Sequence, residues 1–288
     1  MLQDIYPKIF KPEYINKQAE PDSYLLFYNA SSVFLKKTKK GCDRDKEADT
    51  GFLIPTFRYF KEYCSKLIKH SYYLFSIDSE DYYLVLDCTL PEKKTILEEK
   101  IDIFRKLMPK SNAFAVLVGY HIYTWLQSRK YCGSCGTRNI VSDTERALKC
   151  PSCFKVEYPR ISPAVIVAIT DKNRILLTKR ANSDYKLPAL VSGFLEVGET
   201  LEDNVKREVL EEVGINIKNI KYYGSQPWGI AEVIMIAFTA DLDGSDKLTV
   251  AVEELSEAAW FEREEVPVFN AQVSIGQELI RKFREGRL

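Results

Sequence analysis

Carboxylate side chains gather in one short stretch, Gly193–Ile215, which reads GFLEVGETLEDNVKREVLEEVGI. Glu208, Glu211 and Glu212 stand three and four positions apart, so on a helix they share one face. Carboxylates this close repel one another unless a compensating charge lies between them. A divalent cation that prefers oxygen ligands, such as Mg²⁺ or Mn²⁺, supplies that charge. The stretch therefore predicts a metal site, and the alternative is a solvated acidic helix with Glu–Arg pairs.

The element that positions these carboxylates is a predicted helix over Thr200–Val213. Apolar residues recur along it at every fourth position: Leu201, Val205, Val209 and Val213. This spacing places them on one side, where they can pack on a core. Glycines bracket the helix and allow a tight entry, a close backbone approach and a sharp exit: Gly193, Gly198 and Gly214.

These residues form a recognisable motif. The pattern Gly193-x5-Glu199-x7-Arg207-Glu208-Val209-x-Glu211-Glu212-x-Gly214-Ile215 matches the Nudix box at every defined position. The chain thus resembles the Nudix hydrolases, because many fixed positions agree at once. The resemblance implies a metal-dependent hydrolase of a nucleoside diphosphate linked to another moiety.

A second cluster consists of two CxxC pairs separated by fourteen residues: Cys132, Cys135, Cys150 and Cys153. Four thiolates brought to one point give a closed tetrahedral set, which suits structural Zn²⁺. We therefore predict a zinc ribbon without chemistry of its own; a redox dithiol pair and an iron–sulfur site are the alternatives. Nearby basic residues leave nucleic-acid binding open as a minority interpretation. The other cysteines, Cys42, Cys64 and Cys88, are scattered and are interpreted as ordinary residues.

Composition limits the remaining function classes. The chain has 288 residues, with 41 Lys and Arg balanced by 41 Asp and Glu, so no global field attracts nucleic acid or an anionic membrane. The N-terminus lacks the apolar segment of a signal peptide. The longest apolar run, Phe114–Leu126, is too short to span a membrane. We expect a soluble cytoplasmic protein.

The first part of the chain predicts a small α+β domain. A strand pair is expected at Tyr24–Tyr28 and Ser31–Leu35, followed by a charged loop at Lys36–Gly51. Two further strands and two helical segments are expected at Tyr72–Ile77, Tyr82–Leu86, Phe57–Ile68 and Leu107–Gln127.

The last part predicts strands around the acidic helix and a closing helix. The strands are expected at Ala164–Ile169, Ile175–Thr178, Ile220–Gly224, Glu232–Ala240, Leu248–Val250 and Ala258–Phe261, and the helix at Ser274–Arg284. The fold class is α+β. Its three parts are an N-terminal α+β domain (1–127), a zinc ribbon (128–157) and a C-terminal domain (158–288), for which the resemblance implies the αβα sandwich of Nudix proteins.

The order of these parts resembles the bacterial NAD(H) diphosphatase family of Nudix hydrolases. The matching positions are the four cysteines with Trp125, Glu145, Tyr158, Pro159, Pro163 and Ser225–Trp228. The family motif SQPWPFPxS departs here after Trp228, where the chain continues Gly-Ile-Ala-Glu-Val. Two prolines and an aromatic ring are lost, which loosens the backbone and removes a stacking surface. The departure bears on the choice of substrate.

The resemblance also assigns roles to residues. The metal ligands are Glu208, Glu211, Glu212, the carbonyl of Ser192 and Glu254; Glu253 takes the last place if the family alignment has no insertion near Ser245. Arg207 orients the glutamates, or is a surface arginine. The general base is Glu211, Glu212 or Glu254. Substrate contacts fall to Glu145, Tyr158, Gln226, Pro227 and Trp228, with packing roles as the alternative for Tyr158 and Trp228.

Three functions follow from these patterns. The first is hydrolysis of NADH or NAD⁺ to NMN(H) and AMP by a homodimer, with removal of NAD caps from RNA. The second changes the substrate to ADP-ribose, a nucleotide sugar, a dinucleoside polyphosphate or FAD. The third is a ligand sensor or zinc-ribbon nucleic-acid binder without catalysis, and the intact acidic helix argues against it.

Overall fold

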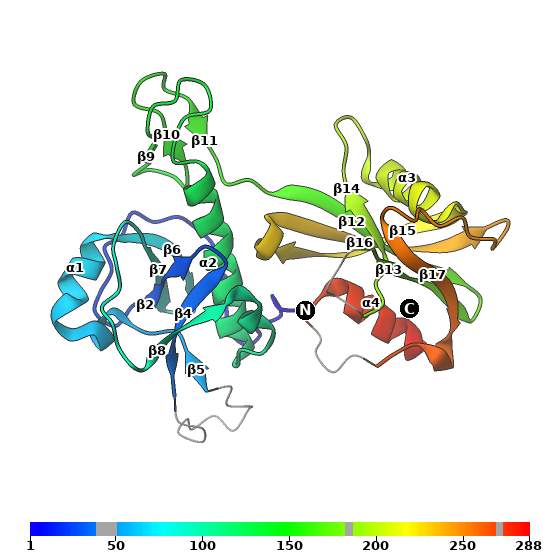
Figure 1. Ribbon diagram of the computed structural model, residues 1–288, viewed down its shortest axis with the longest axis horizontal. Coiled ribbons are helices and arrows are strands. Elements are labelled where there is room, and N and C mark those ends of the chain that lie inside the picture. The colour runs from blue at the N-terminus through cyan, green and yellow to red at the C-terminus, as the bar shows by residue number, and fades with distance from the viewer. Residues whose placement is uncertain (39–50, 182–186, 269–272) are drawn as a thin grey trace. The chain divides into compact units, whose positions relative to one another are not determined.

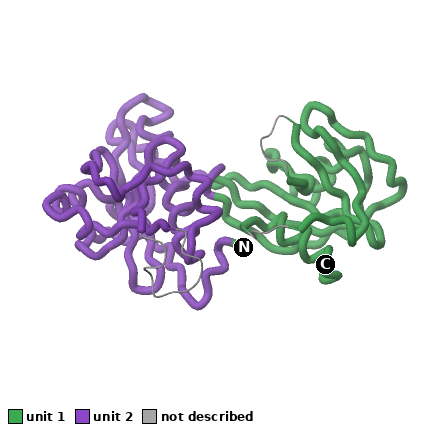
Figure 2. The backbone as a smooth tube through the Cα atoms, turned by 60° about the horizontal axis from the view of Figure 1, so that its bottom comes forward, with its two compact units in different colours: residues 1, 161–228, 232–288 green, residues 2–160, 229–231 purple. Residues whose placement is uncertain are grey.

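A computed structural model describes residues 1–38, 51–181, 187–268 and 273–288 of the chain. Most of the predicted loop at Lys36–Gly51 therefore lies outside the described residues, as does Cys42. Figure 2 shows two compact units, each with its own core. One comprises residues 2–160 and 229–231, and the other comprises residue 1 with 161–228 and 232–288. We call them the N-terminal unit and the C-terminal unit.

The N-terminal unit begins with two four-stranded sheets (Figure 1). The first has the order β1-β6-β7-β2, and the second joins β3, β4, β5 and β8. Their strands are β1 (Phe10–Lys11), β2 (Tyr24–Leu26), β3 (Tyr28–Asn29), β4 (Ser32–Lys37), β5 (Phe52–Leu53), β6 (Ser71–Ile77), β7 (Glu80–Val85) and β8 (Ile96–Lys100).

Helical segments cover these sheets and supply much of the core. They are η1 (Phe57–Tyr63), α1 (Cys64–Lys69), η2 (Ile101–Arg105) and α2 (Lys110–Ser128). Phe57 and Phe60 of η1 are fully buried against Tyr73 and Tyr83 of the β6–β7 hairpin. Burial of such rings is the main stabilising contribution in a core of this kind. The predicted helices and the β6–β7 hairpin are confirmed.

The predicted pairing of Tyr24–Tyr28 with Ser31–Leu35 is only partly correct. β3 does pair with β4, but β2 lies beside β7 in parallel, in the other sheet. The apolar run continues through Phe27, but the strand is interrupted there, where the chain passes from one sheet to the other. Hydrophobic pattern alone does not reveal such a crossing, because both sheets bury these side chains.

A small three-stranded sheet, β11-β10-β9, follows α2 in the N-terminal unit. Its strands are β9 (Ile140–Val141), β10 (Leu148–Lys149) and β11 (Val156–Glu157). Leu148 is buried, whereas β9 and Val156 are exposed. This segment corresponds to the predicted ribbon.

The C-terminal unit is built on one six-stranded mixed sheet. Five strands follow the order β15-β16-β12-β13-β17, and the sixth, β14, pairs with β12. The strands are β12 (Ser162–Asp171), β13 (Arg174–Arg180), β14 (Val191–Phe194), β15 (Asn216–Trp228), β16 (Val233–Asp243) and β17 (Leu255–Glu262). The helical segments are α3 (Leu201–Val213), η4 (Arg263–Glu265) and α4 (Ile275–Arg284).

Alternation along β12 shows that the helices lie on opposite faces of this sheet. Val165 and Val167 belong to one core cluster together with Val205 and Val209 of α3. The intervening Ile166 and Ala168 belong to another cluster with Ile275, Leu279 and Phe283 of α4. Since successive side chains of a strand point to opposite faces, α3 and α4 sandwich the sheet. The predicted αβα architecture is confirmed.

One predicted strand of this unit is wrong. Leu248–Val250 forms no strand, although its neighbours make regular backbone hydrogen bonds. The amide of Thr249 donates to the carbonyl of Val213 at 2.9 Å, and that of Ala251 donates to Glu212 at 3.0 Å. These carbonyls end α3 and have no partner within the helix. The segment is extended because it caps a helix, which a strand-like pattern cannot distinguish.

The apolar character of α2 does not extend far enough to cross a lipid bilayer. Among the described residues, no helix of this structure is both long and apolar enough to span a membrane.

Candidate active site

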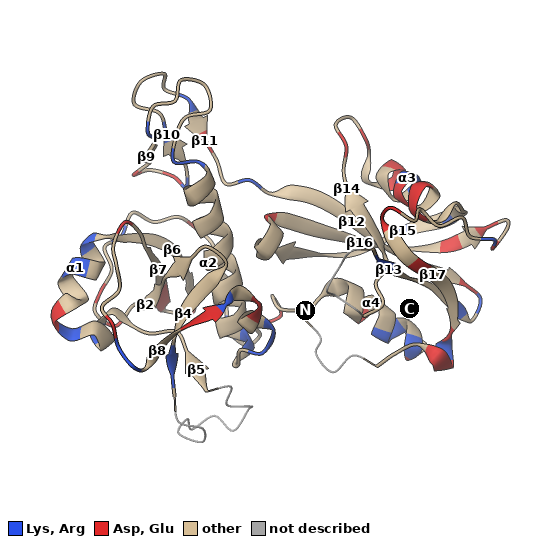
Figure 3. Ribbon diagram, in the orientation of Figure 1, with Lys and Arg blue, Asp and Glu red and all other residues tan. Residues whose placement is uncertain are grey.

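Helix α3 carries the predicted metal ligands, and its ends are fixed by local signals. The Thr200 side chain accepts a hydrogen bond from the amide of Asp203 at 3.2 Å, which caps the first turn. Gly214 ends the helix with a φ of 71°, a left-handed conformation that glycine adopts without strain. Figure 3 shows acidic residues, in red, recurring along α3.

Gly193 on β14 allows the Glu208 carboxylate to lie against the strand. A Cβ at position 193 would meet the three carboxyl atoms of Glu208 at 1.9 to 2.1 Å. No side chain fits into that space, because real contacts of a Cβ are longer than 3 Å. Glu208 is only 8% exposed as a result. The first glycine of the motif is thus a requirement of close packing beside a carboxylate.

Arg207 connects most of the acidic groups. Its guanidinium contacts Glu208 and Glu211 at 2.9 Å each, and Glu199 at 2.6 and 3.0 Å. It also donates to the carbonyl of Phe194 at 3.1 Å. The hydrogen bonds from Arg207 lower the pKa of Glu199 to about 2. The planar guanidinium therefore holds loop and helix carboxylates in one arrangement, and its role in orienting metal ligands stays a prediction.

The remaining carboxylates are poorly compensated. Burial raises the pKa of Glu208, against the lowering effect of Arg207. Burial, followed by the charge of Glu208, raises the pKa of Glu212 to about 8. Glu212 is 5% exposed and makes no ion pair with any described residue. A site with this excess of negative charge favours a bound cation.

Glu254 joins this group from a distant part of the chain. Burial is the largest cause of the raised pKa of Glu208 and of Glu212. The negative charge of Glu254 is a smaller cause that raises both pKa values further. Its carbonyl accepts from the amide of Ala181 at 2.7 Å, which ties it to the end of β13. Glu254, and not Glu253, is among the main causes of the raised pKa of Glu208 and Glu212. The structure thus brings Glu254 to the helix carboxylates.

Ser192 lies on β14 directly before Gly193, so its backbone is adjacent to Glu208. Its hydroxyl accepts a hydrogen bond from the Arg180 guanidinium at 3.1 Å. The positive charge of Arg180 also opposes the raised pKa of Glu212, after burial and the charge of Glu208. Arg180 is a polar group of this site that the sequence patterns did not single out.

The residues present fit a divalent cation of the Mg²⁺ or Mn²⁺ class. The donors are carboxylate and carbonyl oxygens, which hard cations prefer. In the described part of the chain, these carboxylates do not converge as closely as the four cysteines, whose ligand atoms lie within 4.8 Å of one another. Arg207 holds Glu208 and Glu211 at 2.9 Å each, and a cation would reduce the repulsion among the remaining charges.

The predicted substrate residues of the C-terminal unit differ in their surroundings. Gln226 is 1% exposed, and both ends of its amide contact the backbone at the start of α4. It donates to the carbonyl of Val273 at 2.9 Å and accepts from the amide of Ile275 at 2.7 Å. A substrate contact would have to replace one of these bonds. Pro227 is exposed and Trp228 is half-buried at the end of β15. Their substrate contacts stay predictions.

Two other predicted substrate residues meet in the N-terminal unit. The Tyr158 hydroxyl donates to the Glu145 carboxylate at 3.1 Å, and this hydrogen bond raises the pKa of the exposed Tyr158. The pair lies beside the ribbon, 13 positions apart in the chain. The structure brings them together, and their role in binding stays a prediction.

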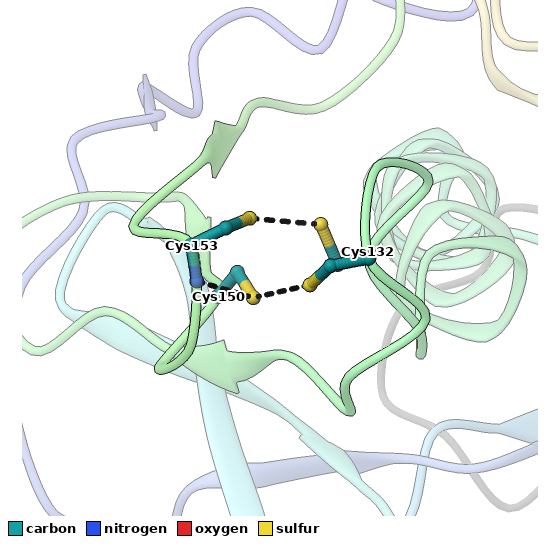
Figure 4. Close-up of side chains that lie close together, drawn as sticks. Cys132, Cys150 and Cys153 are labelled. Atoms are coloured by element: carbon teal, nitrogen blue, oxygen red, sulfur yellow. Dashed lines mark hydrogen bonds between the residues drawn. The ribbon is translucent and has the colours of Figure 1, made fainter.

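The four cysteines form the second predicted metal centre (Figure 4). The Sγ atoms of Cys132 and Cys153 lie 3.5 Å apart, and those of Cys135 and Cys150 lie 3.4 Å apart. A tetrahedral zinc with Zn–S bonds of about 2.3 Å needs sulfur atoms at nearly this spacing. The donor set therefore fits Zn²⁺.

Asn204 is a residue of the motif helix α3 that the sequence patterns did not single out. It is fully buried, and its amide donates to the carbonyl of Phe194 at 2.8 Å and to the Glu199 carboxylate at 3.2 Å. It thus joins α3 to the loop that carries Glu199. The signal available was a polar residue beside Val205 on the apolar side of the helix, where burial requires a partner.

The comparison with known families decides the nature of the C-terminal unit. Residues 160–283 match the sequence model of the NUDIX domain family. Residues 160–283 are a Nudix domain. The predicted recognition of the Nudix box is confirmed, and the carboxylate helix α3 is the helix of that box.

Curated relatives extend the similarity beyond this domain. The chain is 44% identical over 156 residues to a protein named NAD-capped RNA hydrolase NudC from Vibrio parahaemolyticus, covering 54% of this chain and 60% of that one. It is 40% identical over 162 residues to a protein of the same name from Shigella dysenteriae, covering 56% and 63%. The chain thus spans about 60% of the length of these relatives.

Solved structures include similar proteins. A NUDIX hydrolase from Nitrosomonas europaea has a TM-score of 0.47 and 25% identity, and the match covers 55% of this chain and 92% of that one.

Proposed function

We propose that this chain hydrolyses the pyrophosphate bond of NADH or NAD⁺ to NMN(H) and AMP, and removes NAD caps from RNA. The observation that carries the proposal is the buried, poorly compensated pair Glu208 and Glu212 on the box helix of a Nudix domain. The choice of NAD(H) among diphosphates is supported by the similarity to proteins named NAD-capped RNA hydrolases.

In this proposal Glu208, Glu211, Glu212, Glu254 and the carbonyl of Ser192 hold Mg²⁺ or Mn²⁺. Once bound, the cation neutralises the phosphates and acidifies a water molecule. The carboxylates themselves position the cation and accept the proton of the attacking water. Glu211, Glu212 and Glu254 are the candidates for proton acceptance.

Arg207 has a separate role, because its guanidinium is occupied by Glu199, Glu208 and Glu211. It keeps Glu208 beside Gly193 and prevents the loop carboxylate of Glu199 from competing for the cation. Pre-positioning of this kind lowers the reorganisation needed at the moment of reaction. We propose further that the enzyme acts in the cytoplasm as a homodimer, and the size of the protein in solution measured by light scattering tests the second point.

A second substrate class is favoured by the segment after Trp228. Gly229 begins η3 (Gly229–Ala231), and a Cβ there would lie 2.5 Å from the carbonyl oxygen of Leu117 in α2. Position 229 therefore requires glycine, whereas the related motif has proline. A segment with this different packing supports hydrolysis of ADP-ribose, a nucleotide sugar, a dinucleoside polyphosphate or FAD.

A panel of substrates separates these functions. Purified protein is incubated with Mg²⁺ or Mn²⁺ and with NADH, NAD⁺, ADP-ribose, FAD or NAD-capped RNA, beside Glu212→Gln. Faster turnover of NADH and capped RNA than of the other compounds is the expected result. Preference for another diphosphate supports the second class. Binding without turnover of any compound would show a sensor or nucleic-acid binder and overturn the proposal.

A further inference from the structure

The ribbon consists of two halves that match in backbone geometry. In the first half the amide of Gly136 donates to the carbonyl of Cys132 at 2.9 Å. In the second half the amide of Phe154 donates to the carbonyl of Cys150 at 3.0 Å. Both residues directly follow the second cysteine of their CxxC pair. Gly136 and Phe154 therefore occupy equivalent positions.

This equivalence reveals an unusual residue. Gly136 has a φ of 74° and Phe154 a φ of 62°, so both are left-handed. Glycine adopts this conformation freely, but a residue with a side chain loses about 1 to 2 kcal/mol. No compensation comes from packing, because Phe154 is 81% exposed. A strained position that holds an unpacked aromatic ring indicates a contact with another molecule.

The small sheet of the ribbon combines apolar surface with positive charge. Lys149 of β10 lies opposite Val156 on one side and Ile140 on the other, so the three share one face of the ribbon sheet. Ile140 is 55% exposed. In the other half, Tyr131, which is 64% exposed, lies opposite Arg138. Each half thus places a cation beside an apolar or aromatic side chain.

The charge of the ribbon is locally positive although that of the whole chain is balanced (Figure 3). Lys and Arg outnumber Asp and Glu between Arg129 and Tyr158. Most of this charge is engaged within the protein. Glu157 lies 3.3 Å from Arg129 and 3.7 Å from Lys155, Arg138 lies 3.2 Å from Asp87, and the Arg146 guanidinium donates to the carbonyl of Pro12 at 3.0 Å. Lys130 and Lys149 make no ion pair with any described residue. Unpaired lysines beside exposed rings suit a flexible polyanion.

We propose that the ribbon binds single-stranded RNA, with the Phe154 ring as a stacking surface for an unpaired base and the ribbon cations against the phosphates. Exposed aromatic rings accept bases of any sequence, whereas paired bases do not reach them. The inference rests on the proposed function in taking RNA as the polyanion. It adds a binding surface for the RNA chain itself, apart from the nucleotide cap.

The variant Phe154→Gly tests this inference with little risk to the fold, because glycine holds the same position in the other half. Fluorescence anisotropy with a labelled single-stranded RNA carrying a 5′-monophosphate measures the affinity at fixed salt. We expect binding about tenfold weaker than that of the parent protein, a typical loss for one stacked base. Zinc content should stay the same, and thermal stability should not fall.

Two controls sharpen the test. Tyr222→Ser removes another exposed aromatic ring, 64% exposed on β15 of the C-terminal unit, and should leave RNA affinity unchanged. A duplex of the same RNA should bind the parent protein more weakly than the single strand. Equal affinity of Phe154→Gly and the parent, or equal binding of duplex and single strand, would overturn the inference.

NADH turnover separates this inference from the proposed function. RNA binding that depends on Phe154 in a protein without NADH turnover leaves the inference standing and removes the hydrolase proposal. NADH turnover by a parent protein that does not bind RNA removes the inference alone. An affinity loss that merely follows a loss of zinc would likewise count against a stacking role.

Discussion

The cysteine centre and the carboxylate centre differ in how far the protein alone completes them. The four Sγ atoms lie within 4.8 Å of one another, ready to surround one ion. The carboxylates of α3 remain spread, and Arg207 holds only some of them. A closed sulfur set leaves no position for a reacting group, whereas an open oxygen set does. In the proposed function, this difference separates a metal that maintains structure from one that takes part in chemistry.

Local electrostatics sharpen this contrast. Backbone amides stabilise the thiolates: that of Ser134 contacts the Sγ of Cys132 at 3.4 Å, and that of Cys153 contacts the Sγ of Cys150 at 3.4 Å. Glu212 has no comparable partner among the described residues, and burial raises its pKa to about 8. Backbone amides thus donate to sulfur atoms of the cysteine cluster, whereas burial and the charge of Glu208 disfavour the ionised form of Glu212.

The largest effect should follow from Cys150→Ser, which removes a buried ligand of the closed set. Zinc content should fall from about one ion per chain to nearly none, because structural zinc contributes about 10 to 16 kcal/mol to the folding of small domains. Metal analysis and hydrogen exchange over residues 129–158 measure the loss. Cys88→Ser, outside the cluster, is the matched control. Retained zinc in Cys150→Ser would show that three thiolates suffice.

Next in size is Glu212→Gln in the open set. Turnover of NADH with Mg²⁺ should fall about a hundredfold or more, since a charged group near the reacting phosphates is lost. Thermal stability should rise or stay constant, because a stressed charge disappears. Glu202→Gln alters an exposed carboxylate on the first turn of the same helix and should change neither property. Normal turnover by Glu212→Gln would remove this residue from the site.

A smaller effect is expected from Gly193→Ala, whose new Cβ would overlap the Glu208 carboxylate. Either the strand or the carboxylate must move, at a cost of about 1 to 3 kcal/mol. Turnover should fall about tenfold, and higher Mg²⁺ concentrations should restore part of it. Gly133→Ala in the ribbon meets no atom within 4 Å and serves as the control. Equal kinetics in both variants would show that Glu208 can shift freely.

The last prediction concerns the pH dependence of stability rather than turnover. Glu212 has an ordinary pKa of 4.5 in the unfolded chain and a pKa of about 8 in the fold. Between these values the fold retains a proton that the unfolded chain has released, so stability decreases as pH rises. The slope is at most about 1.4 kcal/mol per pH unit. Urea unfolding from pH 5 to 8.5 without added Mg²⁺ measures it.

Two comparisons complete the pH experiment. Glu212→Gln should lack this contribution to the slope, and added Mg²⁺ should flatten the curve of the parent protein because a bound cation favours the charged carboxylate. A parent curve identical to that of Glu212→Gln would show that Glu212 is not stressed in the metal-free protein.

The sequence predicted best where one local pattern has one outcome. The recurrence of Val205, Val209 and Val213 at every fourth position predicted the buried side of α3, and all three are fully buried. The CxxC spacing gave a converging set of thiols, because each turn fixes two ligands by itself. Elements defined by such short-range signals needed no knowledge of the rest of the chain.

Prediction failed where long-range contacts decide. The segment Leu248–Val250 has the composition of a strand, yet its neighbours cap α3. β2 lies in a different sheet from β3, although one apolar run includes both. The closeness of Glu254 to Glu208 and the engagement of Gln226 by the backbone at the start of α4 depend on packing between elements far apart in sequence.

The extended segment that caps α3 fixes the position of Glu254 independently of the length of the preceding turn. Thr249 and Ala251 are hydrogen-bonded to the end of the helix, and Glu254 follows three residues later. On the other side, Gly244 has a φ of 88°, and a Cβ added there would meet no atom within 4 Å, so the preceding turn has room to grow. Residues can be inserted or deleted around Ser245 during evolution without displacing the Glu254 carboxylate. The carboxylate equivalent to Glu254 in related chains is therefore found by counting from the amides that cap α3. Counting through the turn at Gly244, whose length can vary, would select the wrong glutamate.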